Sequence, residues 1–363
     1  MENTISVSTP GRICLFGEHQ DYLGLPVIAA AISRRVNIKG RQYNEPKAII
    51  HLPDIKRNLS FDIFPEMPYT NKRDYFKSAL NILQRNGYTF QNGVECTVRG
   101  NIPINSGTSS SSALLVNWIH FLTKTADNPN ILSNENILSN ETIAEIAYQA
   151  EVAEFKEAGG MMDHYSTAVG NVIYLESTPK IKVETLKPQL GTFVLGDSQE
   201  PKDTVGILKR VKYGVIEAID KIKKVNPDFS LFRANAEELS VYSNLLNNDE
   251  IALIEANIAN RDILKQALQL LKSNSFKDED LGNLLNIHQD NLRDKLKIST
   301  LKIDRMIQAG LDAGALGGKI NGSGGGGCMF VYAPKNAIEV AKTIESQGGK
   351  AYIIRVDEGT KED

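Results

Sequence analysis

The stretch that decides the fold is PINSGTSSSSALL, residues 103–115. It lies between a segment that predicts a strand and an apolar segment that predicts a helix. Gly107 permits a tight turn, and the serines that follow place backbone N–H groups and hydroxyls at the start of the helix. Free N–H groups and the helix dipole favour an anion, most often phosphate. A serine-rich helix cap on an ordinary loop explains the composition about equally well.

A second stretch is rich in glycine. KINGSGGGGCMF, residues 319–330, holds four consecutive glycines. Glycine loses more conformational entropy on folding than other residues, so such a run requires a reason. Close approach of the backbone to a ligand or another loop is one reason, and a flexible linker is the alternative. Because strand-like residues follow at once, an ordered site is the favoured interpretation. The serine loop is not an ordinary P-loop, since no lysine follows it.

A third stretch separates two acidic side chains. In QAEVAEFKEAGGMMDHYS, residues 149–166, Glu151 lies on a predicted helix and Asp163 follows twelve residues later, after a double glycine. Kinases need one carboxylate to hold Mg²⁺ and often another to accept the proton of the attacking hydroxyl. Two acids on separate pieces of one segment could perform those two tasks. The other glutamates of the stretch are interpreted as solvated surface.

A fourth stretch lies near the start of the chain. PGRICLFGEHQDYLG, residues 10–24, places Arg12, Glu18, His19 and Asp21 close together behind a short apolar run. Carboxylates and an imidazole can exchange hydrogen bonds with polyol hydroxyls, and an arginine can stabilise charge on phosphoryl and alkoxide oxygens. Each of the four stretches is a weak or moderate signal alone. Their order along the chain is the stronger signal.

In the order GRICLFGEHQDYLG, INSGTSSSSA, GGMMDH and GSGGGG, these stretches resemble the GHMP kinase superfamily of galactokinase, homoserine kinase, mevalonate kinase and phosphomevalonate kinase. The resemblance covers nearly the whole chain. The stretch GRICLFGEHQDYLG is similar to the galactokinase signature, in which Gly-Glu-His-x-Asp-Tyr follows an arginine. The resemblance therefore implies a galactokinase-like sugar 1-kinase that transfers the γ-phosphate of ATP to a sugar hydroxyl with Mg²⁺.

The resemblance also implies an α+β fold with two domains. Residues 1–185 would form the N-terminal domain with the phosphate-binding loop, and residues 186–363 a ferredoxin-like C-terminal domain with the glycine run. The pattern of elements agrees, because helices and strands mix in both halves without a regular βαβ rhythm. Residues 178–189 are expected to connect the domains, and residues 234–247 are expected to form a helix.

Roles for individual residues follow from the resemblance. Asp163 would accept the hydroxyl proton beside Arg12, and Glu151 would bind Mg²⁺ together with Ser110 or Ser111. The expected nucleotide-binding residues are Gly107, Thr108, Ser109, Ser110, Ser111 and Ser112. The expected substrate-binding residues are Glu18, His19, Asp21, Tyr22, Gly160 and Asp163. The glycines expected to support the site from the second domain are Gly322, Gly324, Gly325 and Gly326.

Several positions depart from the family pattern. Thr108 and Ser112 replace the usual leucine and alanine of the phosphate loop, which are mild changes. His164 stands where glutamine is common, and it would either touch substrate or lie on the helix surface. Residues 195–214 lack the stretch with a sugar-contacting tyrosine and look more like mevalonate and heptose kinases. Two alternatives stay open: a kinase for a non-sugar alcohol such as mevalonate, and a non-catalytic sugar sensor.

The composition of the chain argues against several other classes of protein. The chain has 363 residues, 41% hydrophobic and 23% charged, with a net charge of −3, so no nucleic-acid partner is expected. Its cysteines, Cys14, Cys96 and Cys328, fit neither a disulfide framework nor a zinc site and favour a reducing cytoplasm. No signal peptide and no membrane span are expected. The sequence leaves open the identity of the sugar and whether the protein is a monomer or a dimer.

Overall fold

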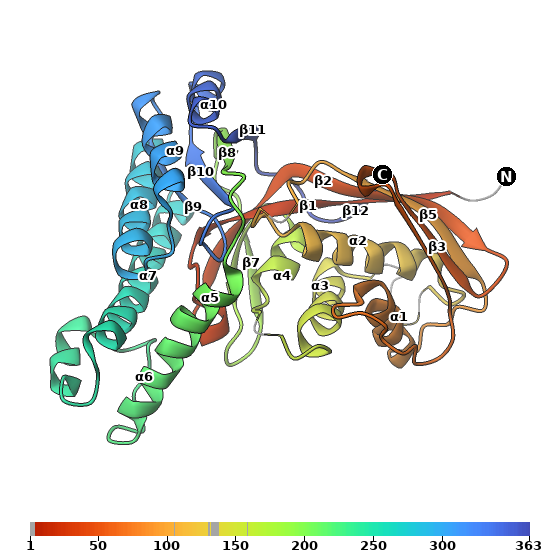
Figure 1. Ribbon diagram of the computed structural model, residues 1–363, viewed down its shortest axis with the longest axis horizontal. Coiled ribbons are helices and arrows are strands. Elements are labelled where there is room, and N and C mark those ends of the chain that lie inside the picture. The colour runs from red at the N-terminus through yellow and green to blue at the C-terminus, as the bar shows by residue number, and fades with distance from the viewer. Residues whose placement is uncertain (1–3, 105, 130, 132–137, 158) are drawn as a thin grey trace.

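The computed structural model describes residues 4–104, 106–129, 131, 138–157 and 159–363. Figure 1 shows two groups of elements, one built on a long sheet with helices on one face and one built on a smaller sheet with a stack of longer helices. The described residues contain no helix that is long and apolar enough to span a membrane. All three cysteines are free and buried.

The first sheet is built around two long antiparallel strands, β1 (Ile5–Phe16) and β2 (Val27–Tyr43). Its strand order is β12-β1-β2-β5-β3-β4, and β6 and β7 branch from β2. Only β3 and β5 pair in parallel among the described strands. The other strands are β3 (Lys47–Leu52), β4 (Arg57–Asp62), β5 (Gly93–Gly100), β6 (Val172–Glu176), β7 (Lys182–Leu186) and β12 (Lys361–Glu362).

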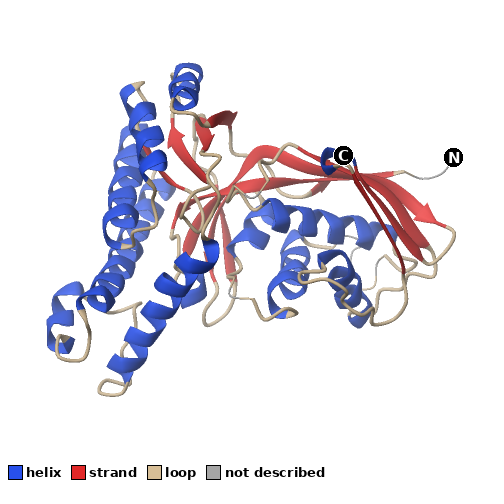
Figure 2. Ribbon diagram, in the orientation of Figure 1, coloured by secondary structure: helices blue, strands red, loops and turns tan. Residues whose placement is uncertain are grey.

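Helices cover one face of this sheet (Figure 2). They are α1 (Tyr75–Arg85), α2 (Ser110–Thr125), α3 (Asn140–Tyr148) and α4 (Met162–Val169). The central helix α2 is buried along most of its length, and its Trp118 is fully buried against Phe76 and Phe121. A helix that is apolar nearly all round belongs in a core. The start of α2 is therefore held rigidly where the serine loop ends.

The second sheet has the strand order β11-β8-β10-β9, with every pair antiparallel. Helices connect β8 to β9 and β10 to β11, which is the β-α-β-β-α-β arrangement of a ferredoxin-like fold. The strands are β8 (Phe193–Asp197), β9 (Gly317–Ile320), β10 (Cys328–Tyr332) and β11 (Lys350–Ile354). The helices are α5 (Thr204–Leu208), α6 (Gly214–Lys223), α7 (Asn248–Lys272), α8 (Asp278–Asp290), α9 (Leu301–Asp312) and α10 (Ala337–Ser346). The expected two-domain α+β fold is confirmed.

Two local expectations were wrong. The expected connection at residues 178–189 contains β7, which pairs with β6 and extends the first sheet. The helix expected over residues 234–247 is only a 3₁₀ segment, Ala236–Tyr242. Within that segment only Leu239 is buried, and Val241 is 77% exposed. A short helix without a continuous apolar face gains too little from tertiary packing to extend.

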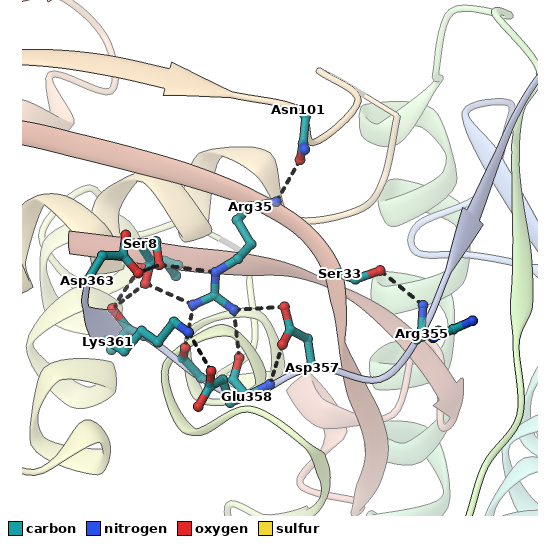
Figure 3. A network of polar contacts seen from close by, with 12 residues as sticks. Ser8, Ser33, Arg35, Asn101, Arg355, Asp357, Glu358, Lys361 and Asp363 are labelled. Atoms are coloured by element: carbon teal, nitrogen blue, oxygen red, sulfur yellow. Dashed lines mark hydrogen bonds and ion pairs between the residues drawn. The ribbon is translucent and has the colours of Figure 1, made fainter. Parts of the chain in front are cut away.

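The end of the chain returns to the first sheet. Beyond β11 the chain pairs Val356 with Ile32, and β12 then pairs with β1. Arg35 holds this tail by donating to the carbonyl oxygens of Ser8, Glu358 and Gly359 and to the carboxylate of Asp357 (Figure 3). The tail therefore ties the last strand of the second sheet to the first two strands of the chain.

Candidate active site

A cavity of about 920 Å³ lies where β1, the start of α2 and the glycine run meet. It brings together polar residues from segments far apart in the sequence. The expected site residues that line it are Arg12, Glu18, His19, Asp21, Tyr22, Gly107, Ser109, Ser110, Ser111, Ser112, Glu151, Gly160, Asp163 and Gly322. Thr108 does not line it, because its buried side chain packs behind the loop and its hydroxyl donates to the carbonyl of Pro103.

The serine loop turns sharply into α2. Gly107 has φ +96° and Ser109 has φ +58°, and α2 begins at Ser110. A side chain at Gly107 would also be crowded, since a Cβ there would lie 3.0 Å from the carbonyl oxygen of Asn321. The backbone N–H groups of the first turn of a helix have no intrahelical acceptor. This helix start therefore offers donors to an anion in the cavity.

The glycine run reaches the cavity from the second domain through Gly322, whereas the expected Gly324, Gly325 and Gly326 do not line it. Gly322, Gly324, Gly325 and Gly326 all have positive φ, from +70° to +111°, a backbone region that other residues rarely adopt. Gly325 donates its N–H to the carbonyl of Ile298, and its own carbonyl accepts from Asp203. The run is thus an ordered loop and not a linker. Gly322 packs directly on Gly107, where a Cβ would lie 3.1 Å from the Gly107 oxygen.

Arg12 and Asp163 form an ion pair at the cavity wall. The Arg12 Nε and Nη2 atoms lie 2.9 Å and 2.7 Å from Asp163 Oδ1, and the Asp163 side chain remains 33% exposed. Burial alone would raise the pKa of Asp163, but the charge of Arg12 and its hydrogen bond outweigh burial and lower the pKa below the ordinary value. Asp163 is therefore ionised at neutral pH and can accept a proton from a bound hydroxyl.

Asp21 lies close to Asp163 and packs against a glycine. A Cβ on Gly160 would stand 1.8 Å from Asp21 Oδ2, so any larger residue here would displace the Asp21 carboxylate. Burial and the charge of Asp163 raise the pKa of Asp21 to about 6. The Asp21 Oδ1 atom accepts from the backbone N–H of Tyr22 at 2.9 Å. The cavity thus holds two carboxylates, one with a lowered pKa and one with a raised pKa.

His19 and Glu18 already have protein partners. The His19 Nε2 atom lies 3.0 Å from the carbonyl of Ser323, so Nε2 donates there and Nδ1 accepts from the hydroxyl of Tyr22 at 2.7 Å. Burial lowers the pKa of His19 to about 4, so the ring is neutral. Glu18 is almost fully buried and forms an ion pair with Lys319, and its Oε2 atom has no hydrogen-bond partner among the described residues.

Comparison with protein families decides the identity of this arrangement. The profile for the GHMP kinases N terminal domain matches residues 74–171, and the profile for the GHMP kinases C terminal domain matches residues 267–350. The chain belongs to the GHMP kinase family. It is therefore a kinase that phosphorylates an alcohol group, and members of this family use ATP as the co-substrate. A third profile, the galactokinase galactose-binding signature, matches residues 2–41 of this GHMP kinase.

Individual relatives of this GHMP kinase divide between two activities. A mevalonate kinase of Pyrococcus furiosus is 28% identical over 98% of this chain and 98% of its own length. A galactokinase of Haemophilus influenzae is 27% identical over 94% of this chain and 88% of its own length. The solved structure of Lactococcus lactis galactokinase complexed with galactose has the same fold, with a TM-score of 0.82, 21% identity and coverage of 99% of this chain and 95% of that chain.

Glu151 of this GHMP kinase lies in the last turns of its helix, in a π-helical segment, Gln149–Ala153. Its Oε2 atom accepts from His164 Nε2 at 2.7 Å, and His164 is buried. His164 therefore orients the carboxylate. The helix-surface interpretation was wrong, because the side chain is buried, whereas His164 lines the cavity and its contact with substrate stays a prediction. Mg²⁺ typically combines one or two carboxylates with substrate phosphates. Glu151 and the serine hydroxyls that line the same cavity fit such a shared ion.

Three polar residues, one lining the cavity and two buried behind it, escaped the sequence analysis. Lys202 lines the cavity beside Gly107, and no carboxylate in the described part of the chain pairs with it. Burial and the charge of Arg12 lower the pKa of Lys202. Lys319 and Asn321 precede the glycine run and are both fully buried. Lys202 lies outside the four stretches. Lys319 and Asn321 lie within the glycine-rich stretch, but no local pattern indicates their contacts, so only the tertiary structure reveals all three.

Proposed function

We propose that this kinase is galactokinase-like and transfers the γ-phosphate of ATP to a hydroxyl of a sugar. The observation that carries this proposal is the pair of carboxylates, Asp21 and Asp163, on the cavity wall. Carboxylates accept hydrogen bonds from the hydroxyls of a neutral polyol. An acceptor that brings its own carboxylate would face like charges in a partly desolvated site, which is unfavourable. The galactokinase galactose-binding signature over residues 2–41 supports the same assignment.

In the proposed reaction, Asp163 accepts the proton of the attacking hydroxyl while Arg12 stands beside it. The lowered pKa of Asp163 keeps it ionised, as a proton acceptor requires. Arg12 carries a fixed positive charge next to the position where charge develops on the phosphoryl group. Phosphoryl transfer leaves little covalent chemistry for the protein, so the rate enhancement comes from positioning and charge neutralisation.

The nucleotide is proposed to bind at the start of α2. The backbone N–H groups of residues 107–112 would cradle its phosphates, and Lys202 would contribute a positive charge from the second domain. The glycines Gly322, Gly324, Gly325 and Gly326 would support the loop from the other side. Glu151 and Ser110 or Ser111 would hold Mg²⁺, which when bound neutralises charge on the β- and γ-phosphates.

The sugar is proposed to bind at the opposite end of the cavity. Asp21 would accept hydrogen bonds from the sugar hydroxyls, and the pair of His19 and Tyr22 would form the neighbouring wall. Gly160 leaves room for the Asp21 carboxylate. Glu18 remains a proposed contact at the base of the cavity through its unpartnered Oε2 atom.

Mevalonate is the second candidate acceptor, because mevalonate kinases are among the relatives that span the chain, including one with 28% identity. The deciding experiment is a coupled ADP-release assay with ATP and Mg²⁺. The acceptors are galactose, glucose, arabinose, galacturonate, glucuronate, N-acetylhexosamines, a heptose phosphate and mevalonate. Turnover of one neutral sugar far above the rest supports the proposal. Turnover of mevalonate alone, or ATP binding without turnover of any sugar, contradicts it.

A further inference from the structure

Asn321 is a buried carboxamide at the junction of the two domains. It follows β9 immediately and precedes the first glycine of the run. Its Oδ1 atom accepts the backbone N–H of Cys14 on β1 at 2.9 Å, and its Nδ2 atom donates to the carbonyl of Gly107 at 2.9 Å. One side chain from the second domain thus contacts both β1 and the phosphate loop of the first domain.

Lys319 reinforces this contact from the same face of β9. Side chains two residues apart on a strand point to the same side. The Lys319 Nζ atom donates to the carbonyl of Cys14 at 3.0 Å and pairs with Glu18. On this edge of β1 the strand β12 pairs only with Val7 and Ser8. Near Cys14, therefore, the two side chains satisfy backbone groups that a neighbouring strand would otherwise satisfy.

The carbonyl oxygen of Gly107 has a second donor. It accepts from Arg12 Nη1 at 2.5 Å as well as from Asn321 Nδ2. Arg12 uses its other two nitrogen atoms on Asp163. A continuous series of hydrogen bonds therefore runs from Asn321 through Gly107 to Arg12 and Asp163. The position of the Gly107 carbonyl determines both the shape of the phosphate loop and the orientation of the guanidinium.

We propose that Asn321 is a positioning residue for phosphoryl transfer. It fixes the positions of the phosphate loop and Arg12 relative to the glycine run of the second domain. Asn321 does not line the cavity; it acts through Gly107 and Arg12. The inference rests on the proposed nucleotide-binding role of the phosphate loop, and it is independent of which alcohol is the acceptor.

The test compares two isosteric substitutions. Asn321→Asp keeps an oxygen for the Cys14 N–H but removes the donor to Gly107. Asn81→Asp is the matched control, because the fully buried Asn81 likewise accepts from the backbone N–H of Met67 and donates to its carbonyl, on α1 away from the cavity. Isothermal titration calorimetry with ADP and Mg²⁺ measures nucleotide affinity, and thermal unfolding measures stability.

We expect Asn321→Asp to weaken ADP binding by about tenfold or more, since the Gly107 carbonyl loses one of its two donors and faces a carboxylate oxygen instead. With any acceptor that the wild type turns over, kcat should fall while the KM for the acceptor stays within about twofold. Asn81→Asp should lower the melting temperature but leave the ADP affinity unchanged. If Asn321→Asp does not fold, Asn321→Ser, which buries no charge, is measured in its place.

Wild-type ADP affinity in the folded Asn321 variant would overturn the inference. Equal weakening of ADP binding by Asn81→Asp would overturn it too, because general destabilisation would then explain the effect. A wild-type protein that binds no ADP with Mg²⁺ would instead refute the proposed nucleotide site, so the two failures are distinguishable.

Discussion

Arg12 holds the carboxylate of Asp163 through two nitrogen atoms, with Nη2 at 2.7 Å and Nε at 2.9 Å from the same oxygen, Oδ1. The two residues are 151 positions apart in the sequence and come from β1 and from the start of α4. The charge of Arg12 keeps the carboxylate of Asp163, the proposed proton acceptor, ionised, and part of this carboxylate stays exposed to the cavity.

Asp163→Asn should nearly abolish phosphoryl transfer. The amide cannot accept the hydroxyl proton, and loss of a general base typically lowers kcat by about 10²–10⁴. ADP affinity should change far less, because the phosphate loop is intact. Steady-state ADP release together with calorimetric ADP binding measures both quantities. A near-wild-type kcat in this variant would show that another group accepts the proton.

Gly160→Ala should impair acceptor binding selectively. Its Cβ would stand 1.8 Å from Asp21 Oδ2, so the Asp21 carboxylate must move. We expect the KM for the sugar to rise by about tenfold or more, with the KM for ATP little changed. Gly159→Ala is the matched control, because a Cβ there would meet only a Val152 methyl at 3.2 Å. Equal effects of the two substitutions would contradict the role of the Asp21 contact.

Asp21→Asn should stabilise the protein at high pH. In the folded state burial and Asp163 raise the pKa of Asp21 from 3.8 to about 6, so ionisation destabilises the folded state. This destabilisation is absent below pH 3.8, where Asp21 is protonated in the folded and unfolded states, and it is complete above pH 6. The free energy of unfolding of the variant should exceed that of the wild type by about 1–3 kcal/mol at pH 8, and this difference should shrink as the pH falls toward 4. Urea unfolding across this range measures it, and a gain independent of pH would refute the explanation.

Lys202→Met should weaken nucleotide binding. Lys202 lies beside the proposed phosphate loop without a carboxylate partner among the described residues, and its lowered pKa reflects burial and the charge of Arg12. Loss of one charge-assisted contact to phosphate should raise the KM for ATP by about tenfold. The exposed Lys209 offers the control substitution Lys209→Met, which should leave the KM for ATP unchanged. An unchanged KM for ATP in both variants would place Lys202 outside the nucleotide site.

Arg35→Ala should release the C-terminal tail from the first sheet. Arg35 donates to three backbone carbonyls and pairs with Asp357 (Figure 3), so its removal leaves several acceptors without a donor. We expect the free energy of unfolding to fall by about 2–3 kcal/mol and amide hydrogen exchange to become faster over residues 355–363. Arg34→Ala is the control, because the neighbouring Arg34 stacks on Tyr352 and makes no ion pair with the described part of the tail. Unchanged exchange in the tail would contradict the anchoring role of Arg35.

Much of the fold was predictable because its signals are local. Ser139 accepts from the N–H of Thr142 and caps α3, as its position before the helix predicts. The phosphate loop combines a glycine with the start of a helix, and that chemistry is complete within a few residues. The helix expected over residues 234–247 failed for the opposite reason, since its stability depended on an apolar face that the packing does not provide.

The sequence by itself therefore determined the GHMP kinase family, and it predicted the phosphate loop, the glycine loop and the acidic residues that line the cavity. Backbone geometry and helix termini act over short distances, so a single stretch of residues specifies them. Only the tertiary structure decided the partners of those residues. Glu18 pairs with Lys319 and Cys14 with Asn321, across 301 and 307 positions of the chain. Such contacts depend on how two domains pack together, and no local pattern of residues encodes that packing.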